Sequence, residues 1–300
     1  MLDTHTHLIP AGLERFAGVE WDGRLTIDGH RLGVAALFQP PALLGWMAGH
    51  GVTSAWVSAP PPTYRQHLSE AEAREWWGAV NAGLAAICAE HAALTALPHL
   101  PVEHPGLALE IAQAGRAQGL RRFAMAAGDG TRMLSDASYE PLWAALAHCA
   151  LLMHPAETPD ARLGPFYMEN LVGNPQETGI AGAHLILGGV LQRHPTLRII
   201  LAHAGGTLPM IAGRLQHGFA SGRAGMDLTL EAPLIAARRL WADIMAHHPT
   251  GLALAAEIFG ADHVVFGTDW PFPMGLPEPA EQLPASSLRD AIMARGDILA

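Results

Sequence analysis

Short apolar runs rich in β-forming residues alternate with helical patterns along the whole sequence, and this alternation constrains the fold more than any other feature. Such alternation is typical of βα units that build a parallel sheet. The runs that qualify as strands are residues 2–8, 53–59, 94–101, 120–127, 150–156, 198–205, 240–246 and 263–270. They predict an α/β protein with a (β/α)8 TIM barrel. Because 300 residues suit one such barrel, we expect a single domain over residues 1–300.

Helical patterns fill most of the intervals between these strands. The expected helices are residues 68–92, 106–118, 139–149, 176–193, 207–219, 251–260 and 286–298. Ser69 and Glu72 have the spacing of a capping box, and Gly260 follows the end of a helical run.

The interval between the first two strands departs from this pattern. Residues 9–45 contain RLTIDGHRL, in which Asp28-Gly29 joins two short runs as in a tight hairpin. We expect a small flap insertion over the C-terminal ends of the barrel strands, where barrel enzymes place their sites. Residues 59–62 and 157–175 are expected to border the same mouth.

The amino-acid composition limits the kinds of molecule that this protein is expected to bind. The formal charge is −10 and no run of basic residues occurs, which argues against nucleic acid or an anionic membrane surface. No apolar run reaches the roughly 18 residues of a membrane span. The opening MLDTHTHLIP has no secretory pattern, so we expect a soluble, cytoplasmic protein that binds a small molecule. The two cysteines, Cys88 and Cys149, fit small core residues.

Polar residues gather where the predicted strands end. His5 and His7 alternate on the first strand and therefore share a face. His154 closes the fifth strand, His203 the sixth and Asp269 the eighth. An aspartate and several histidines are costly to bury without partners, and a divalent cation supplies one. The alternative, independently satisfied polar residues, does not explain why all of them stand at strand ends.

We assign His5, His7, His154 and Asp269 to one metal ion and reserve His203 as an acid/base beside it. Three imidazoles and a carboxylate suit zinc, which is the first choice, while manganese, iron and cobalt remain open.

Several dispersed motifs carry a family resemblance. DTHTHLIP, the HP after strand five, AHAGGTLP and GTDWPFP resemble the amidohydrolase superfamily, and within it the branch of 2-amino-3-carboxymuconate 6-semialdehyde decarboxylase. The similarity is densest over residues 170–219. Ala156-Glu157 stands where that decarboxylase has an aromatic residue after HP, which leaves the substrate open.

The resemblance implies roles for individual positions. His5, His7, His154 and Asp269 match the family's metal ligands, and His203 matches its catalytic acid/base; Asp269 belongs to the catalytic set as well. Arg31 and Arg214 resemble two arginines that hold substrate carboxylates. The second of these reaches a neighbouring subunit's site in that family, so a homodimer is implied.

The sequence contains no lysine. Binuclear members of the superfamily often bridge two metals with a carboxylated lysine, which this chain cannot supply. One metal ion is therefore expected.

The leading functional hypothesis is a metal-dependent, non-oxidative decarboxylase of an unsaturated or aromatic carboxylic acid. A guanidinium orients the carboxylate, and His203 manages the proton that replaces it. A metal-dependent hydrolase of an ester, lactone, amide or carbon–carbon bond remains the alternative. A binding protein without turnover ranks last. Further candidates near the mouth, each equally well explained as an ordinary structural residue, are Phe166, Tyr167, Trp270, Phe272 and His247.

Overall fold

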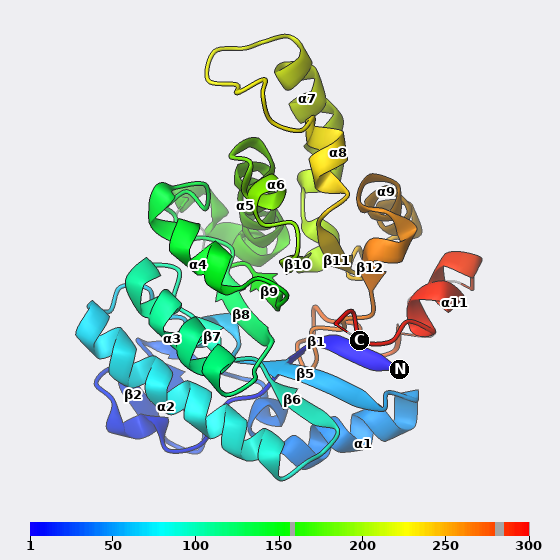
Figure 1. Cartoon of the computed structure of the whole chain (residues 1–300). Coiled ribbons are helices and arrows are strands. Elements are labelled where there is room, and N and C mark those ends of the chain that lie inside the picture. The colour runs from blue at the N-terminus through cyan, green and yellow to red at the C-terminus, as the bar shows by residue number, and fades with distance from the viewer. Residues whose placement is uncertain (157–159, 280–284, 300) are drawn as a thin grey trace.

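The computed structural model describes residues 1–156, 160–279 and 285–299. Its strands form a closed ring surrounded by helices (Figure 1). The barrel strands are β1 (Leu2–His7), β5 (Ser54–Ser58), β6 (Leu94–Ala96), β7 (His99–Leu100), β8 (Arg122–Ala126), β9 (Ala150–His154), β10 (Arg198–Leu201), β11 (Trp241–Asp243) and β12 (Val264–Val265). The helices are α1 (Pro40–His50), α2 (Glu70–Ala89), α3 (Pro105–Ala117), α4 (Glu140–Ala145), α5 (Asn174–Leu187), α6 (Val190–Arg193), α7 (Leu208–Ala220), α8 (Pro233–Ala237), α9 (Pro249–Phe259) and α11 (Ser287–Met293).

Parallel pairing joins the strands in chain order. One sheet runs β1-β5-β6 and the other β7-β8-β9-β10-β11-β12. The third barrel strand is divided into β6 and β7 at Leu97-Pro98 because proline has no N–H to donate to a neighbouring strand. Closure occurs at β1, where Thr6 forms a parallel bridge with Trp270 and the backbone N–H of His7 donates to Trp270 O at 2.8 Å. The predicted (β/α)8 barrel is confirmed.

The strand alternation separates an apolar lumen from a polar rim. Ala150 and Leu152 of β9 pack inside the barrel with Trp56 and Ile200, and all four side chains are buried. His154 continues the same two-residue period on β9, so its ring faces inward at the C-terminal end of the strand. Apolar side chains therefore fill the interior of the barrel, and the functional side chains gather at the C-terminal ends of the strands.

The segment between β1 and β5 contains a separate antiparallel sheet in the order β2 (Val19–Trp21), β3 (Leu25–Ile27), β4 (His30–Arg31). Ile27 pairs with His30 across Asp28-Gly29, which confirms the hairpin. The sheet occupies only part of residues 9–45, because α1 begins at Pro40. That it covers the barrel mouth stays a prediction.

The expected mouth segment 157–175 lies partly outside the described residues, at 157–159. From residue 160 onward it forms short turns of helix, Ala161–Leu163, Pro165–Tyr167 and Glu169–Gly173. No helix within the described ranges is both long and apolar enough to cross a membrane.

Candidate metal centre

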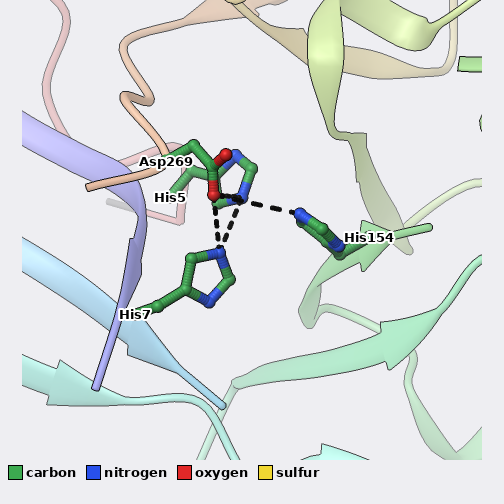
Figure 2. A group of neighbouring side chains, drawn as sticks. All are labelled: His5, His7, His154 and Asp269. Atoms are coloured by element: carbon green, nitrogen blue, oxygen red, sulfur yellow. Dashed lines mark hydrogen bonds and ion pairs between the residues drawn. The ribbon is translucent and has the colours of Figure 1, made fainter. Parts of the chain in front are cut away.

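Four side chains from distant parts of the sequence converge at the C-terminal rim of the barrel. His5 and His7 lie on β1, His154 ends β9, and Asp269 follows β12. Figure 2 shows their ring nitrogens and carboxylate oxygens pointing toward one another. Each residue offers one ligand atom, and these atoms all lie within 4.8 Å of one another. The structure thus brings together the four residues that the sequence assigned to a metal.

The spacing of these atoms matches that of ligands around one ion. His5 Nε2 lies 3.1 Å from His7 Nε2 and 3.4 Å from Asp269 Oδ1. Asp269 Oδ1 lies 2.9 Å from His7 Nε2 and 4.0 Å from His154 Nε2. A tetrahedron with bonds of about 2.1 Å has edges of about 3.4 Å, so a divalent ion fits between them with small adjustments.

The partners of the outer ring nitrogens fix the histidine tautomers. His5 Nδ1 lies 2.8 Å from a carboxylate oxygen of Asp243, and His154 Nδ1 lies 2.8 Å from the carbonyl oxygen of Pro155. Both partners can only accept, so both Nδ1 atoms donate. Ser58 Oγ donates to a backbone carbonyl and therefore accepts from His7 Nδ1, at 3.1 Å. In each neutral ring the lone pair of Nε2 then faces the cluster.

This arrangement places three lone pairs and a carboxylate opposite one another, all of them acceptors. His154 Nε2 and Asp269 Oδ1 are buried and have no hydrogen-bond partner among the described residues. Unpaired buried acceptors are costly, and a cation satisfies all of them together. The residues therefore fit a divalent metal.

Electrostatics favour the protonation states that metal binding needs. Burial lowers the pKa of His7 and of His154, the latter to well below its usual value. Burial works against ionised Asp269, but contacts with His203 and His7 hold its pKa well below the usual range. Neutral imidazoles and an ionised carboxylate are the forms that bind metal. His5 differs, because Asp243 and Asp269 raise its pKa despite complete burial.

Asp243, at the end of β11, organises this rim, and our sequence analysis did not single it out. Besides His5, its carboxylate accepts the backbone N–H groups of His203 at 3.0 Å, Ala204 at 2.8 Å and Met245 at 3.0 Å. His203 and Ala204 have φ of +56° and +54°, a strained conformation for residues with a side chain. Asp243 thus holds both a metal-ligand histidine and the strained loop that carries His203.

Asp3 was missed as well. It is completely buried on β1, and its carboxylate accepts the backbone N–H of His5 at 3.0 Å and the Thr268 hydroxyl at 2.5 Å. Asp3 therefore ties the strand of the two histidines to the segment that carries Asp269. The signal was present in the sequence, since residues 3, 5 and 7 alternate onto the same face.

The structure places His203 beside the cluster. Its Nε2 lies 3.9 Å from Asp269 Oδ2, and its ring centroid lies 5.0 Å from that of His154. The side chain is 15% exposed, so it is the member of this group with the most access to an incoming molecule. This position is compatible with the acid/base role expected from the sequence.

The two arginines lie away from these contacts. Arg31 is on β4 and pairs with Asp22, with two N–O distances of 3.2 Å. Arg214 is exposed on α7, and within the described ranges it forms no hydrogen bond or ion pair. Their contact with a substrate stays a prediction.

Of the aromatic candidates, Phe272 contacts a ligand histidine, with its ring centroid 5.5 Å from that of His7. Trp270 is buried, whereas Phe166 and Tyr167 are largely exposed. His247 is exposed, and desolvation of its ring together with the charge of His203 lowers its pKa.

Comparison with known proteins places this geometry in context. The family model described as Amidohydrolase matches residues 2–292. The chain is 37% identical over 131 residues to the 2-amino-3-carboxymuconate-6-semialdehyde decarboxylase of Caenorhabditis elegans, which covers 42% of this chain but only 32% of that protein. It is 28% identical over 294 residues to a decarboxylase of Penicillium terrestre, covering 90% of this chain and 84% of that one.

A solved structure with the same fold is the 5-carboxyvanillate decarboxylase of Novosphingobium aromaticivorans. The TM-score is 0.72 at 21% identity, covering 83% of this chain and 75% of that one. That structure is complexed with manganese and 4-hydroxy-3-methoxy-5-nitrobenzoic acid.

Proposed function

Because this chain belongs to the amidohydrolase family, we propose that it is a metal-dependent decarboxylase of an unsaturated or aromatic carboxylic acid. The observation that carries the proposal is the set of three Nε2 lone pairs and one carboxylate that face one another without a donor. The names of the similar proteins support the choice of carbon dioxide loss, since both curated relatives described above are decarboxylases.

We propose one divalent ion held by His5, His7, His154 and Asp269. Zinc is the first candidate because three imidazoles and a carboxylate suit it, and manganese is the second because it is the ion in the 5-carboxyvanillate decarboxylase structure. When bound, the ion supplies positive charge that stabilises negative charge developing on a substrate oxygen.

The chain's own residues would handle orientation and the proton. Loss of carbon dioxide leaves an electron pair on carbon, which must take up a proton. His203 Nε2, at the edge of the cluster, is placed to deliver this proton to the carbon that carries the carboxylate. Asp269 keeps His203 oriented through its second oxygen while its first faces the metal position.

Arg31 and Arg214 complete the proposal as carboxylate-binding residues, since a guanidinium pairs with a carboxylate through two hydrogen bonds. To bind the substrate carboxylate, Arg31 would have to give up its ion pair with Asp22. Arg214 would act in a neighbouring subunit, which requires a homodimer.

The face around α7 supports such a dimer. The helix packs between α5 and α8, and in Figure 1 α7, α8 and the loop between them extend away from the strands. Met210 is 79% exposed, Ile235 61% and Ile180 44%. A hollow beside Ile180 and Ile211 lies between α5 and α7. Exposed apolar side chains gathered in this way are typical of a protein interface.

The decisive experiment measures carbon dioxide release from a panel of aromatic and muconate acids by protein loaded with zinc or manganese. In D2O, the product should carry one deuterium at the carbon that lost the carboxylate. His203→Gln should reduce release by 100-fold or more. The matched variant His148→Gln, at an exposed position before the N-terminal end of β9, should not change it. Hydrolysis products without carbon dioxide would instead support the alternative, a metal-dependent hydrolase that uses the same cluster and His203.

A single domain over residues 1–300 and a cytoplasmic location remain part of the proposal.

A further inference from the structure

The proposed reaction does not use one buried tyrosine hydroxyl that lies beside the metal cluster. Tyr64 follows β5 and the turn Pro61–Thr63, on the side of the barrel where the strands end. Its side chain is 2% exposed, and its hydroxyl is shielded from solvent without a hydrogen-bond partner among the described residues. Few buried hydroxyls in folded proteins lack a partner, so this one calls for an explanation.

The ring of Tyr64 is held between the metal cluster and the protein core. Its centroid lies 4.4 Å from that of His99, and His99 in turn stacks on Trp77 at 3.9 Å. On the other side, the Tyr64 and His154 rings meet edge to face, with centroids 6.5 Å apart. Tyr64 is therefore a direct neighbour of a metal-ligand histidine.

The residues next to Tyr64 in sequence fix its backbone. Arg65 donates to both carboxylate oxygens of Asp28, at 2.7 and 2.8 Å. Trp76 Nε1 donates to the carbonyl of Thr63 at 2.8 Å, and the Gln66 side chain donates to the carbonyl of Gly128 at 2.8 Å. Because the segment is anchored on both sides, the position of the hydroxyl is set before any ligand arrives.

The chemistry of the hydroxyl limits what it can do. Burial, and after it the negative charge of Asp269, raises the pKa of Tyr64, so the phenol keeps its proton throughout the physiological range. A protonated phenol is a hydrogen-bond donor.

We propose that Tyr64 is a substrate-binding residue whose hydroxyl donates a hydrogen bond to an oxygen atom of the acid bound at the metal cluster. The inference rests on the proposed function for the class of substrate. It adds a neutral donor to the arginines expected from the sequence and places that donor on the rim beside His154. Such a residue favours acids that present an acceptor oxygen there, because an acid without one would leave the buried hydroxyl unpaired.

The test compares wild-type protein with Tyr64→Phe, both loaded with manganese. Isothermal titration with 4-hydroxy-3-methoxy-5-nitrobenzoate and with 2,6-dihydroxybenzoate gives the affinity, and metal analysis gives the ion content. The variant keeps the ring and its stacking, so it should hold as much manganese as the wild type. Its melting temperature should be equal or higher, because an unpaired buried hydroxyl has been removed. Its affinity for at least one acid should fall 10-fold or more.

Tyr139→Phe is the matched control. Tyr139 is also buried, but its hydroxyl donates to the carbonyl of Val102 at 2.6 Å. This variant should melt at a lower temperature and bind the acids as the wild type does.

Three results would overturn the inference: equal affinities of Tyr64→Phe and the wild type for both acids, loss of manganese in the variant, or no binding of either acid by the wild type. Equal affinities would mean that the hydroxyl serves only a buried water. Carbon dioxide release separates this outcome from the proposed function. If Tyr64→Phe binds both acids and releases carbon dioxide as the wild type does, the proposed function stands and the role of Tyr64 is refuted. If acid binding depends on Tyr64 but the wild type releases no carbon dioxide, the role of Tyr64 stands and the proposed function is refuted.

Discussion

Carboxylates at the rim differ sharply in what surrounds them. Asp269 faces three imidazoles, and Asp243 accepts three backbone N–H groups in addition to the ring of His5. The pKa of each carboxylate is lowered although burial opposes this, and for Asp243 the ring of His5 is the main cause. Glu103 has weaker compensation, since its Oε1 is buried without a hydrogen-bond partner among the described residues and burial is the largest influence on its pKa.

Replacing Asp243 should weaken metal binding. Asp243→Asn removes the charge that fixes the tautomer of His5 and loosens the loop of His203. Loss of such an outer partner typically lowers metal affinity 10- to 100-fold. Competition with a chelator of known affinity measures the change. Asp227→Asn, in an exposed turn where Asp227 accepts from Thr229, should behave as the wild type. Unchanged affinity in Asp243→Asn would contradict the positioning role.

Glu103 should make stability depend on pH. Burial raises its pKa from 4.5 to about 7. Between these pH values the folded state therefore binds more protons than the unfolded chain. The contribution of Glu103 to the free energy of unfolding is complete below about pH 4.5 and is lost as the pH rises through 7. A pKa shift of this size corresponds to a change of about 3 kcal/mol in the free energy of unfolding. Urea unfolding at pH 5 and pH 8 measures it, and Glu103→Gln should lose less stability over this interval than the wild type. The same loss in both proteins would refute the assignment.

At the scale of elements, the sequence predicted the barrel strands well, because each is a short apolar run followed by a helix. The differences have local causes. The expected helix 176–193 is two helices, since Gly189 between α5 and α6 has φ of +70°. The expected helix 139–149 ends at Ala145. Helices α1 and α8 were not predicted, because one lies inside the assumed flap and the other spans only five residues.

The site was less predictable than the fold. The metal residues could be inferred because they end strands, but the partners of their outer nitrogens could not. Asp243 reaches His5 across 238 positions of sequence, and Ser58 reaches His7 across 51. Such pairs depend on how neighbouring strands align, and periodicity within one strand does not contain that information. The missing partner of Tyr64 is likewise a property of packing.

One buried arginine ties the small sheet β2-β3-β4 to the segment after β5. The Arg65 side chain is 5% exposed, donates to both oxygens of Asp28 and to the carbonyl of Ala17, and lies 4.8 Å from the centroid of the Trp76 ring. Lysine has a single ammonium group and cannot form this fork. Arg65→Lys should therefore increase hydrogen exchange over residues 17–31 by 10-fold or more.

Hydrogen exchange measured by mass spectrometry locates this change. The matched variant Arg162→Lys, whose exposed side chain pairs with Asp160, should leave exchange in residues 17–31 unaltered. Equal protection of these residues in Arg65→Lys and the wild type would show that other contacts hold the sheet.

At the scale of the whole molecule, the proposed metal ligands connect the first barrel strand, the fifth barrel strand and the segment that follows the last barrel strand. An ion that binds only the folded state therefore stabilises the closed barrel. At a free concentration 1,000 times its dissociation constant it contributes about 4 kcal/mol. Calorimetry with zinc and with excess chelator should show a melting temperature several degrees higher with zinc. His154→Ala should show a much smaller difference, and an equal difference would place the stabilising ion elsewhere.

The proposed dimer also belongs to this scale. Met210→Asp places a charge among the exposed apolar residues of α7 and should convert a dimer into monomers that keep their melting temperature within a few degrees. Light scattering measures the mass, and carbon dioxide release should fall with it if Arg214 acts across the interface. Leu120→Asp, at an exposed apolar residue outside α7, should leave the mass unchanged. A wild type that is monomeric at all concentrations would exclude the dimer.

The hydrogen bond from the Thr268 hydroxyl to Asp3 joins residues that are 265 positions apart in the sequence. During translation, His5 and His7 leave the ribosome more than 260 residues before Asp269 does. A nascent chain thus exposes two histidines long before the remaining ligands exist. The complete set of four ligands therefore forms only after Asp269 has been made.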